Sequence, residues 1–146
     1  MTVSLYQASV PVFTQILTAL SACLKKGEAH AEAKKFDPAV LIEARLAPDM
    51  FPLVRQIQIA TDMAKGACAR LAGAEVPSWA DNEKSFAEIH ARIKKAVDYA
   101  AGFKAERFAG AEDRDITLTI GGEKMTFKGA DYLFHFVHPN FYFHAT

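Results

Sequence analysis

The chain has 146 residues, of which 51% are hydrophobic and 23% charged, and these values predict a single globular domain over residues 1–146. Its 17 basic residues equal its 17 acidic residues, so we expect neither nucleic acid nor an anionic membrane as a partner. The sequence has no signal-peptide pattern and no run of about 18 apolar residues, which excludes a membrane-spanning helix and favours a cytoplasmic location.

The first predicted helix starts near Ser4, because residues 4–7 read SLYQ and match a capping box. Apolar residues then recur at steps of three and four, which is typical of one helical face. They are Val10, Phe13, Leu17, Leu20 and Leu24. We expect Pro11 to kink this helix and Gly27 to end it. Residues 28–35 are polar and have no apolar stripe, which favours an exposed connection.

Three further helices are predicted between residues 37 and 103. Asp37 and Pro38 favour a short helix through about Arg45. A second long helix carries an apolar face and ends at Gly73. That face comprises Leu53, Ile57, Ala60, Ala64, Ala67 and Leu71. A capping box at residues 85–88, SFAE, opens a third long helix that ends at Gly102.

Two cysteines and several carboxylates in this region have plain structural interpretations. Cys23 and Cys68 fall on apolar helical stripes, which favours buried thiols over a disulfide or a nucleophile. The acidic residues outside the apolar faces sit in polar stretches, where solvated side chains are expected. These include Asp81, Glu83 and Glu88.

The apolar period changes from helical to alternating at residues 116–128. Ile116, Leu118 and Ile120 alternate with threonines, and the pair Gly121–Gly122 separates them from a second alternating run. This pattern predicts a β-hairpin before the last helix. An isolated hairpin is marginally stable, so we expect its apolar face to pack on the bundle.

The last segment, residues 131–146, holds three of the five histidines and six of the fifteen Phe and Tyr residues. A fourth helix is predicted here, disturbed at Pro139 because a proline disfavours the helical conformation of the preceding His138. No cap or glycine precedes Thr146, so we expect this helix to be truncated and the natural chain to continue.

The histidines of this segment do not form a metal site by spacing alone. On an unbroken helix His135 and His144 lie on opposite faces, whereas Asn140 and His144 share one. Zinc sites use three or four ligands, so another helix would have to complete the set. The alternative interpretation of His135 and His138 is a hydrogen-bonded core histidine. His30 and His90 are expected at the surface.

Three segments of the chain resemble a known family. They are SLYQASVP at residues 4–11, PDMFPLVRQ at residues 48–56 and PNFYFH at residues 139–144. They are similar to a bacterial family known only as a domain of unknown function, within the DinB-like (YfiT-like) superfamily of proteins regarded as metalloenzymes. The resemblance implies an all-α four-helix bundle, often dimeric, that binds a divalent metal. Some members are thiol-dependent transferases or isomerases.

The resemblance also implies where the metal ligands would fall. Typical members use one histidine on the second helix and a His-x-x-x-His pair on the fourth. The pair falls on Asn140 and His144, and the second-helix histidine falls at or near Gln56. Only His144 keeps an imidazole, and amides bind zinc or nickel far more weakly. Asp49 and His138 are the substitutes available if the fold brings them close.

Two hypotheses for function follow. The first is a pocket with a degenerate metal site that binds a small molecule, with or without a divalent metal such as zinc or nickel. It would be built from Gln56, Asp49, Asn140, His144 and His138, with Tyr142 among its aromatic walls. The alternative is a non-enzymatic, dimeric bundle in which Gln56 and Asn140 are buried amides that bond across helices. The sequence leaves open whether the protein is an enzyme.

Overall fold

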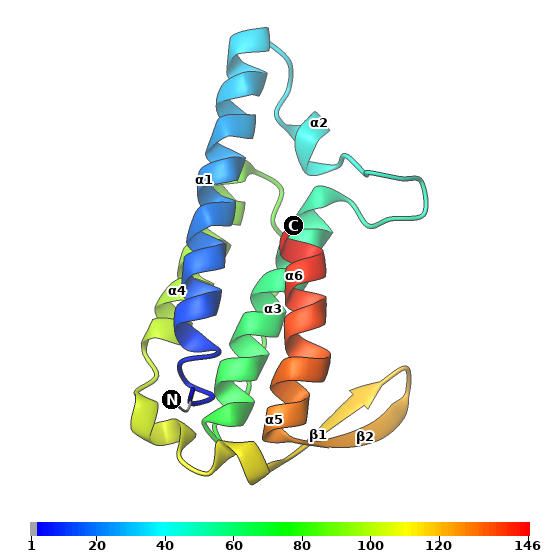
Figure 1. The fold of residues 1–146 in the computed structure, drawn as a ribbon. Coiled ribbons are helices and arrows are strands. Elements are labelled where there is room, and N and C mark those ends of the chain that lie inside the picture. The colour runs from blue at the N-terminus through cyan, green and yellow to red at the C-terminus, as the bar shows by residue number, and fades with distance from the viewer. Residues whose placement is uncertain (1–2) are drawn as a thin grey trace.

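The structure, a computed structural model, describes residues 3–146 and has a four-helix bundle as its main body. Three of its helices are α1 (Val10–Lys34), α3 (Leu53–Leu71) and α4 (Phe86–Ala101). The fourth is a composite helix from Gly129 to Ala145, and it packs mainly on α3, while α1 packs mainly on α4 (Figure 1). The predicted mainly helical architecture is confirmed. Within the described residues, no helix has both the length and the hydropathy needed to cross a membrane.

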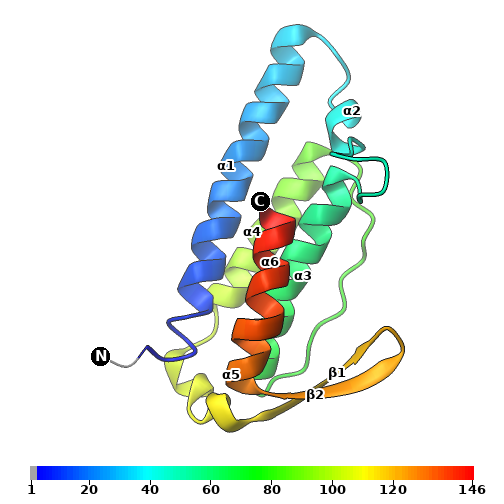
Figure 2. The same ribbon diagram turned by 45° about the vertical axis from the view of Figure 1, so that its right-hand side comes forward.

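Short elements and one long connection join these helices. The helix α2 (Ala39–Ile42) lies between α1 and α3, and the 3-10 turns η1 (Ala105–Phe108) and η2 (Ala111–Asp113) follow α4. The predicted glycine at the end of α3 is confirmed, since Gly73 has φ of +65°. From there to Ser85 the chain runs in an extended course back along the bundle (Figure 2).

The predicted hairpin is confirmed. Strands β1 (Asp115–Ile120) and β2 (Glu123–Lys128) pair antiparallel, with Asp115 opposite Lys128 and Ile120 opposite Glu123. Ile116 and Leu118 are buried, and the Phe127 ring lies 5.7 Å from the Phe136 ring. Met125 is 45% exposed, so the apolar face of β2 packs only in part.

The composite helix has three parts: α5 (Gly129–Asp131), the π-helical segment η3 (Tyr132–Val137) and α6 (His138–Ala145). The disturbance expected at Pro139 takes the form of the π-helical segment before it rather than of a break, because His138 is helical with φ −59° and ψ −48°. The His138 N–H bonds the Leu133 carbonyl, five residues back. Pro139 lies in the first turn of α6, where its missing N–H is tolerated, and the wider π turn lies just before it.

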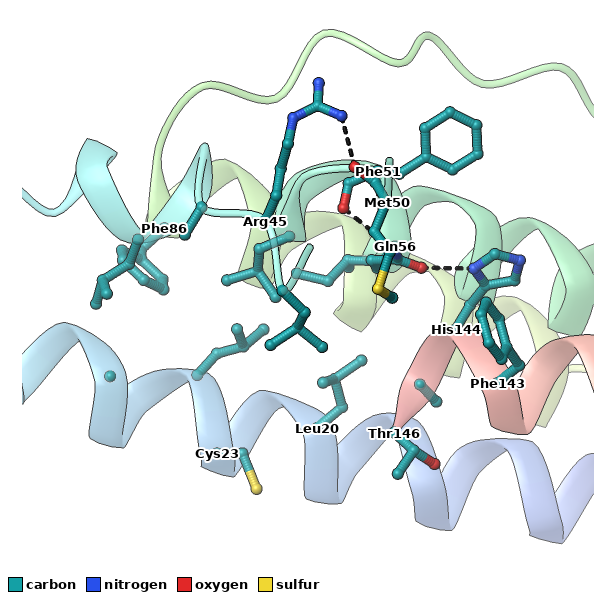
Figure 3. Close-up of a pocket in the computed structure, with 18 residues that line it drawn as sticks. Leu20, Cys23, Arg45, Met50, Phe51, Gln56, Phe86, Phe143, His144 and Thr146 are labelled. Atoms are coloured by element: carbon teal, nitrogen blue, oxygen red, sulfur yellow. Dashed lines mark hydrogen bonds between the residues drawn. The ribbon is translucent and has the colours of Figure 1, made fainter. Parts of the chain in front are cut away.

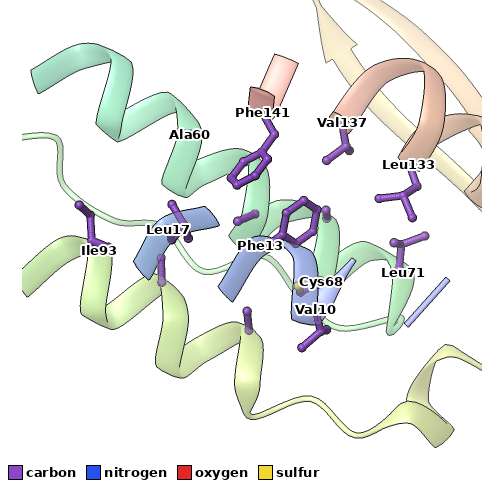
Figure 4. Packing of buried hydrophobic residues seen from close by; sticks show 14 of the residues in the cluster. Val10, Phe13, Leu17, Ala60, Cys68, Leu71, Ile93, Leu133, Val137 and Phe141 are labelled. Atoms are coloured by element: carbon purple, nitrogen blue, oxygen red, sulfur yellow. The ribbon is translucent and has the colours of Figure 1, made fainter. Parts of the chain in front are cut away.

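The core forms where the four helices face one another (Figure 4). Phe13 and Leu17 of α1, and Leu133, Val137 and Phe141 of the composite helix, are fully buried. The Phe13 and Phe141 rings meet edge to face at 4.8 Å. The three alanines on the predicted apolar face of α3 are fully buried too. They are Ala60, Ala64 and Ala67.

Helix α1 departs from the sequence prediction in three ways. It does not end at Gly27 but runs to Lys34, so residues 28–34 are helical rather than an exposed connection, and Ala31 is fully buried. Pro11 lies in its first turn and does not interrupt the hydrogen-bond ladder. The Ser4–Gln7 pair forms the expected reciprocal bonds, but these cap a turn that precedes α1.

The start signals predicted for α2 and α4 agree more closely with the structure. The Asp37 carboxylate accepts the Ala39 N–H at 2.9 Å, although α2 ends at Ile42 rather than near Arg45. At α4 the Ser85 and Glu88 side chains cap each other's backbone N–H groups. Their bonds satisfy donors that the first turn of a helix leaves free.

Candidate functional site

A hydrogen bond between Gln56 and His144 joins α3 to the end of the composite helix. His144 Nδ1 lies 2.6 Å from Gln56 Oε1, and Gln56 Nε2 donates to the Phe51 carbonyl at 3.2 Å. Because the Gln56 oxygen can only accept, this network places the proton of neutral His144 on Nδ1. His144 Nε2 then carries the lone pair, which can accept a hydrogen bond or take up a proton.

The two residues sit at one side of a cavity of about 430 Å³ (Figure 3). The cavity lies between α1, the segment from α2 to α3, and the end of α6. Most of its wall is hydrocarbon, supplied by aliphatic and aromatic side chains. These include Leu20, Leu24, Leu41, Leu53, Ile57, Phe86 and Phe143.

The polar groups at this cavity are few. Besides Gln56 and His144, Arg45 lines the wall and donates from Nη1 to the Met50 carbonyl at 2.5 Å. Burial lowers the pKa of His144, and the positive charge of Arg55 lowers it further. His144 is therefore neutral at pH 7 and presents an uncharged imidazole to the cavity.

The other residues predicted for the site do not join this pair. The Asn140 amide donates to the Phe136 carbonyl of its own helix at 2.7 Å, and Asp49 is exposed and does not line the cavity. The His138 ring stacks on Tyr142 with centroids 5.5 Å apart, near Phe13. Of the candidate residues, the cavity wall thus contains only Gln56 and His144.

The side chains at the three implied ligand positions do not fit a resident zinc or nickel ion. Within residues 3–146, no group of three or more His, Cys, Asp or Glu side chains could hold a metal. At the three positions implied by the resemblance there are two amides and one imidazole, and both amides already donate to backbone carbonyls. Amides replace imidazole poorly as ligands of these ions.

Two other residues lie where the sequence analysis did not expect them. Cys23 is exposed, and it lines the cavity, whereas Cys68 is buried, which raises the pKa of its thiol to about 12. His90 is not a surface residue, because its side chain is 19% exposed and its Nδ1 lies 2.8 Å from Ser21 Oγ of α1.

Sequence reasoning missed a buried polar cluster around Arg92. The Arg92 side chain is 3% exposed, yet it contacts the carboxylates of Asp62, Asp81 and Glu83 at 3.0–3.1 Å. Desolvation opposes the ionisation of Glu83, but hydrogen bonds from Arg92 and Gln58 outweigh it and hold the pKa of Glu83 below its usual value. Glu83 is therefore a structural ion-pair partner rather than a solvated side chain, whereas Asp81 is exposed as expected and pairs with Arg92 as well.

Comparisons with known proteins agree with this architecture. Residues 5–146 match the model of the family described as Domain of unknown function (DUF1993). A crystal structure described as a DinB family member protein from Shewanella denitrificans matches with a TM-score of 0.88 and 39% identity, over 97% of this chain and 80% of that one. No curated protein matches the chain. The chain belongs to the DUF1993 family and shares its fold with DinB-like bundle proteins.

Proposed function

We propose that the protein binds a small, mainly apolar molecule in the cavity beside Gln56 and His144, without a resident metal. The single observation that carries the proposal is the hydrogen-bonded Gln56–His144 pair at the wall of that cavity. Apolar cavities with a few polar groups at one side are the usual form of small-molecule sites.

The size and lining of the cavity define the ligand class. A volume of about 430 Å³ lies within the usual range for ligand pockets. Its hydrocarbon walls favour a ligand with an aliphatic or aromatic body. Such a body fits between Leu20 and Leu24 of α1 and Phe86 of α4.

The polar side of the cavity sets the orientation of this ligand. His144 Nε2 is free to accept a hydrogen bond, because Nδ1 is committed to Gln56. Arg45 donates to the Met50 carbonyl and keeps further guanidinium hydrogens for a ligand oxygen.

Fluorescence of 1-anilinonaphthalene-8-sulfonate, an apolar probe with one anionic group, tests the cavity. We expect saturable binding near one probe per chain, weakened about tenfold or more by Leu20→Trp, which fills the cavity with an indole. Ala19→Trp is the matched control, because Ala19 is the exposed neighbour of Leu20 on α1. Equal binding by both variants would overturn the proposed site.

Zinc and nickel titrations by calorimetry test the metal-free part of the proposal. We expect wild type to bind neither ion at micromolar concentration, and His144→Ala to change nothing. The double variant Gln56→His, Asn140→His, which places an imidazole at each of the three positions implied by the resemblance, is the positive control for zinc binding. Micromolar zinc binding by wild type that His144→Ala abolishes would overturn the metal-free proposal.

A homodimeric bundle is the second candidate, and an aromatic row on the composite helix favours it. Phe134 and Tyr142 are 47% and 42% exposed, and the His138 ring lies between them. Exposed aromatic side chains that lie in a row are typical of interfaces. Sedimentation velocity of wild type and of Phe134→Lys tests this candidate, and a wild-type monomer at all concentrations would refute it.

A further inference from the structure

A second cavity, of about 410 Å³, lies toward the other end of α3 from the first. It is bounded by α3, by β1 of the hairpin and by the π-helical segment η3, with Val76 of the long connection at its margin. The two cavities share no lining residue. The hairpin and the lower end of the composite helix lie beside this part of α3 in Figure 2.

Arg70 brings a positive charge to this cavity without a carboxylate to balance it. Its Nη1 donates to Tyr132 Oη at 3.0 Å, and in the part of the chain that the structure describes no acidic side chain lies within 4.0 Å of its guanidinium. Lys65 and Asp62 also line the cavity, but they pair with each other at 2.7 Å, and Asp62 pairs with Arg92 as well. A half-buried guanidinium with free hydrogens favours an anionic partner.

Tyr132 adds a second donor beside Arg70. The residue is 1% exposed, and its hydroxyl oxygen accepts from Arg70. Over residues 3–146 the hydroxyl hydrogen of Tyr132 has no acceptor in the hydrogen-bond network. Burial raises the pKa of Tyr132, so this group stays protonated and able to donate. Buried donors normally have a partner, and this one lines a cavity where a ligand oxygen could supply it.

Gly66 gives the guanidinium its position. A Cβ atom at Gly66 would overlap Arg70 Nη1, so a larger residue one turn earlier would force the end of this flexible side chain to shift. Glycine inside a helix destabilises it relative to alanine. Gly66 therefore leaves room for the Arg70 guanidinium in its observed position, at a cost to the intrinsic stability of α3.

We propose that this second cavity binds a small organic oxyanion, a carboxylate or a phosphate, through the Arg70 guanidinium and the Tyr132 hydroxyl. The anion supplies the missing counter-charge of Arg70 and the missing acceptor of Tyr132. The body of the ligand rests on the apolar side chains of the wall, which include Met63, Val76 and Phe136. The site is independent of the first cavity and of its ligand.

Two-dimensional ¹H–¹⁵N NMR titrations with benzoate and with inorganic phosphate, at constant ionic strength, test this proposal. We expect one of the two probes to cause saturable shifts at Lys65–Arg70 and at Thr117–Ile120, and to shift the Arg70 Nε–H signal. Saturation by benzoate identifies a carboxylate site, and saturation by phosphate identifies a phosphate site. Shifts that rise linearly for both probes would overturn the proposal.

Gly66→Ala is the sharpest variant, because it keeps the charge and the helix but displaces the guanidinium. We expect affinity for the binding probe to fall about tenfold. Gly27→Ala is the matched control, since its Cβ would make only an ordinary contact, 3.8 Å from Leu41 Cδ1. Unchanged affinity in Gly66→Ala contradicts the proposal.

Arg70→Gln and Tyr132→Phe separate a binding site from a purely structural contact. Both variants should lose affinity for the probe, Arg70→Gln the more, while circular dichroism stays native. If Arg70→Gln does not fold, Gly66→Ala still decides the matter. If Arg70→Gln is less stable and wild type binds neither probe, Arg70 serves only to hold Tyr132 against α3. The proposal would then fail.

Discussion

At the scale of single residues, the pKa values of two histidines on α6 predict how stability depends on pH. Burial lowers the pKa of both His138 and His144 below the usual histidine value of 6.5. The unfolded chain therefore takes up protons at these residues at a higher pH than the folded chain does. We expect the free energy of unfolding to fall as pH drops through about 6.5, as measured by urea denaturation at pH 7.5 and 5.5.

Variants isolate this contribution from that of the carboxylates. His144→Gln keeps a partner for Gln56, and His138→Phe keeps the stack on Tyr142, so both should fold and lose less stability between the two pH values. His30→Gln is the control, because His30 is exposed. The same loss in all three variants as in wild type would show that other groups carry the pH dependence.

The residues of the site were predictable only in part. Gln56 and His144, two of the three ligand positions implied by the family resemblance, do form a hydrogen bond, of 2.6 Å. They meet because the bundle brings α3 beside the end of α6. Asp49 and Asn140 do not join them. Asp49 lies in an exposed loop and the Asn140 amide bonds the backbone of its own helix, so local backbone geometry sets where each side chain points. The apolar cavity could not be read from the sequence, because its walls come from segments more than 100 residues apart.

At the scale of elements, the end of α1 holds an unusual backbone conformation. Lys35 has φ of +59°, and the Phe36 N–H bonds the Ala31 carbonyl while the Lys35 N–H bonds the Glu32 carbonyl. This is the Schellman arrangement, whose left-handed position favours glycine. Lys35→Gly should raise the free energy of unfolding by about 0.5–1 kcal/mol, measured by urea denaturation.

Lys34→Gly is the matched control for this prediction. Lys34 is the last helical residue of α1 and has a right-handed conformation. Glycine there should destabilise the protein by up to about 1 kcal/mol. An equal effect of glycine at both positions would mean that the left-handed conformation of Lys35 is not what limits stability.

Elements with strong local signals were predicted well, and those that depend on tertiary contacts were not. The Ser85 capping box and the Gly121–Gly122 turn are encoded within a few residues. Residues 28–34 lack an apolar stripe but stay helical, because they extend an existing helix and bury Ala31. The π turn of η3 left no signal beyond the proline that follows it.

At the scale of the whole molecule, Arg92 ties three parts of the chain together. From α4 it bonds Asp62 on α3 and both Asp81 and Glu83 on the long connection. Its Nε donates to Thr61 at 2.8 Å. The connection has no helix or strand of its own between Gly73 and Ser85, so these bonds fix its course along the bundle. Helical periodicity could not reveal this role, because charged residues normally lie on solvated faces.

Replacing Arg92 should therefore destabilise the entire fold rather than one helix. Arg92→Met keeps much of the volume but leaves the carboxylate of Glu83, whose side chain is 9% exposed, without its cation. We expect a loss of about 3 kcal/mol in the free energy of unfolding by urea denaturation. Adding Glu83→Gln should recover part of that loss, since it removes the stranded charge. Lys94→Met is the control on the same helix, because Lys94 is 73% exposed and should cost less than about 0.5 kcal/mol. If Arg92→Met costs no more than this control, the network around Arg92 does not hold the long connection to the bundle.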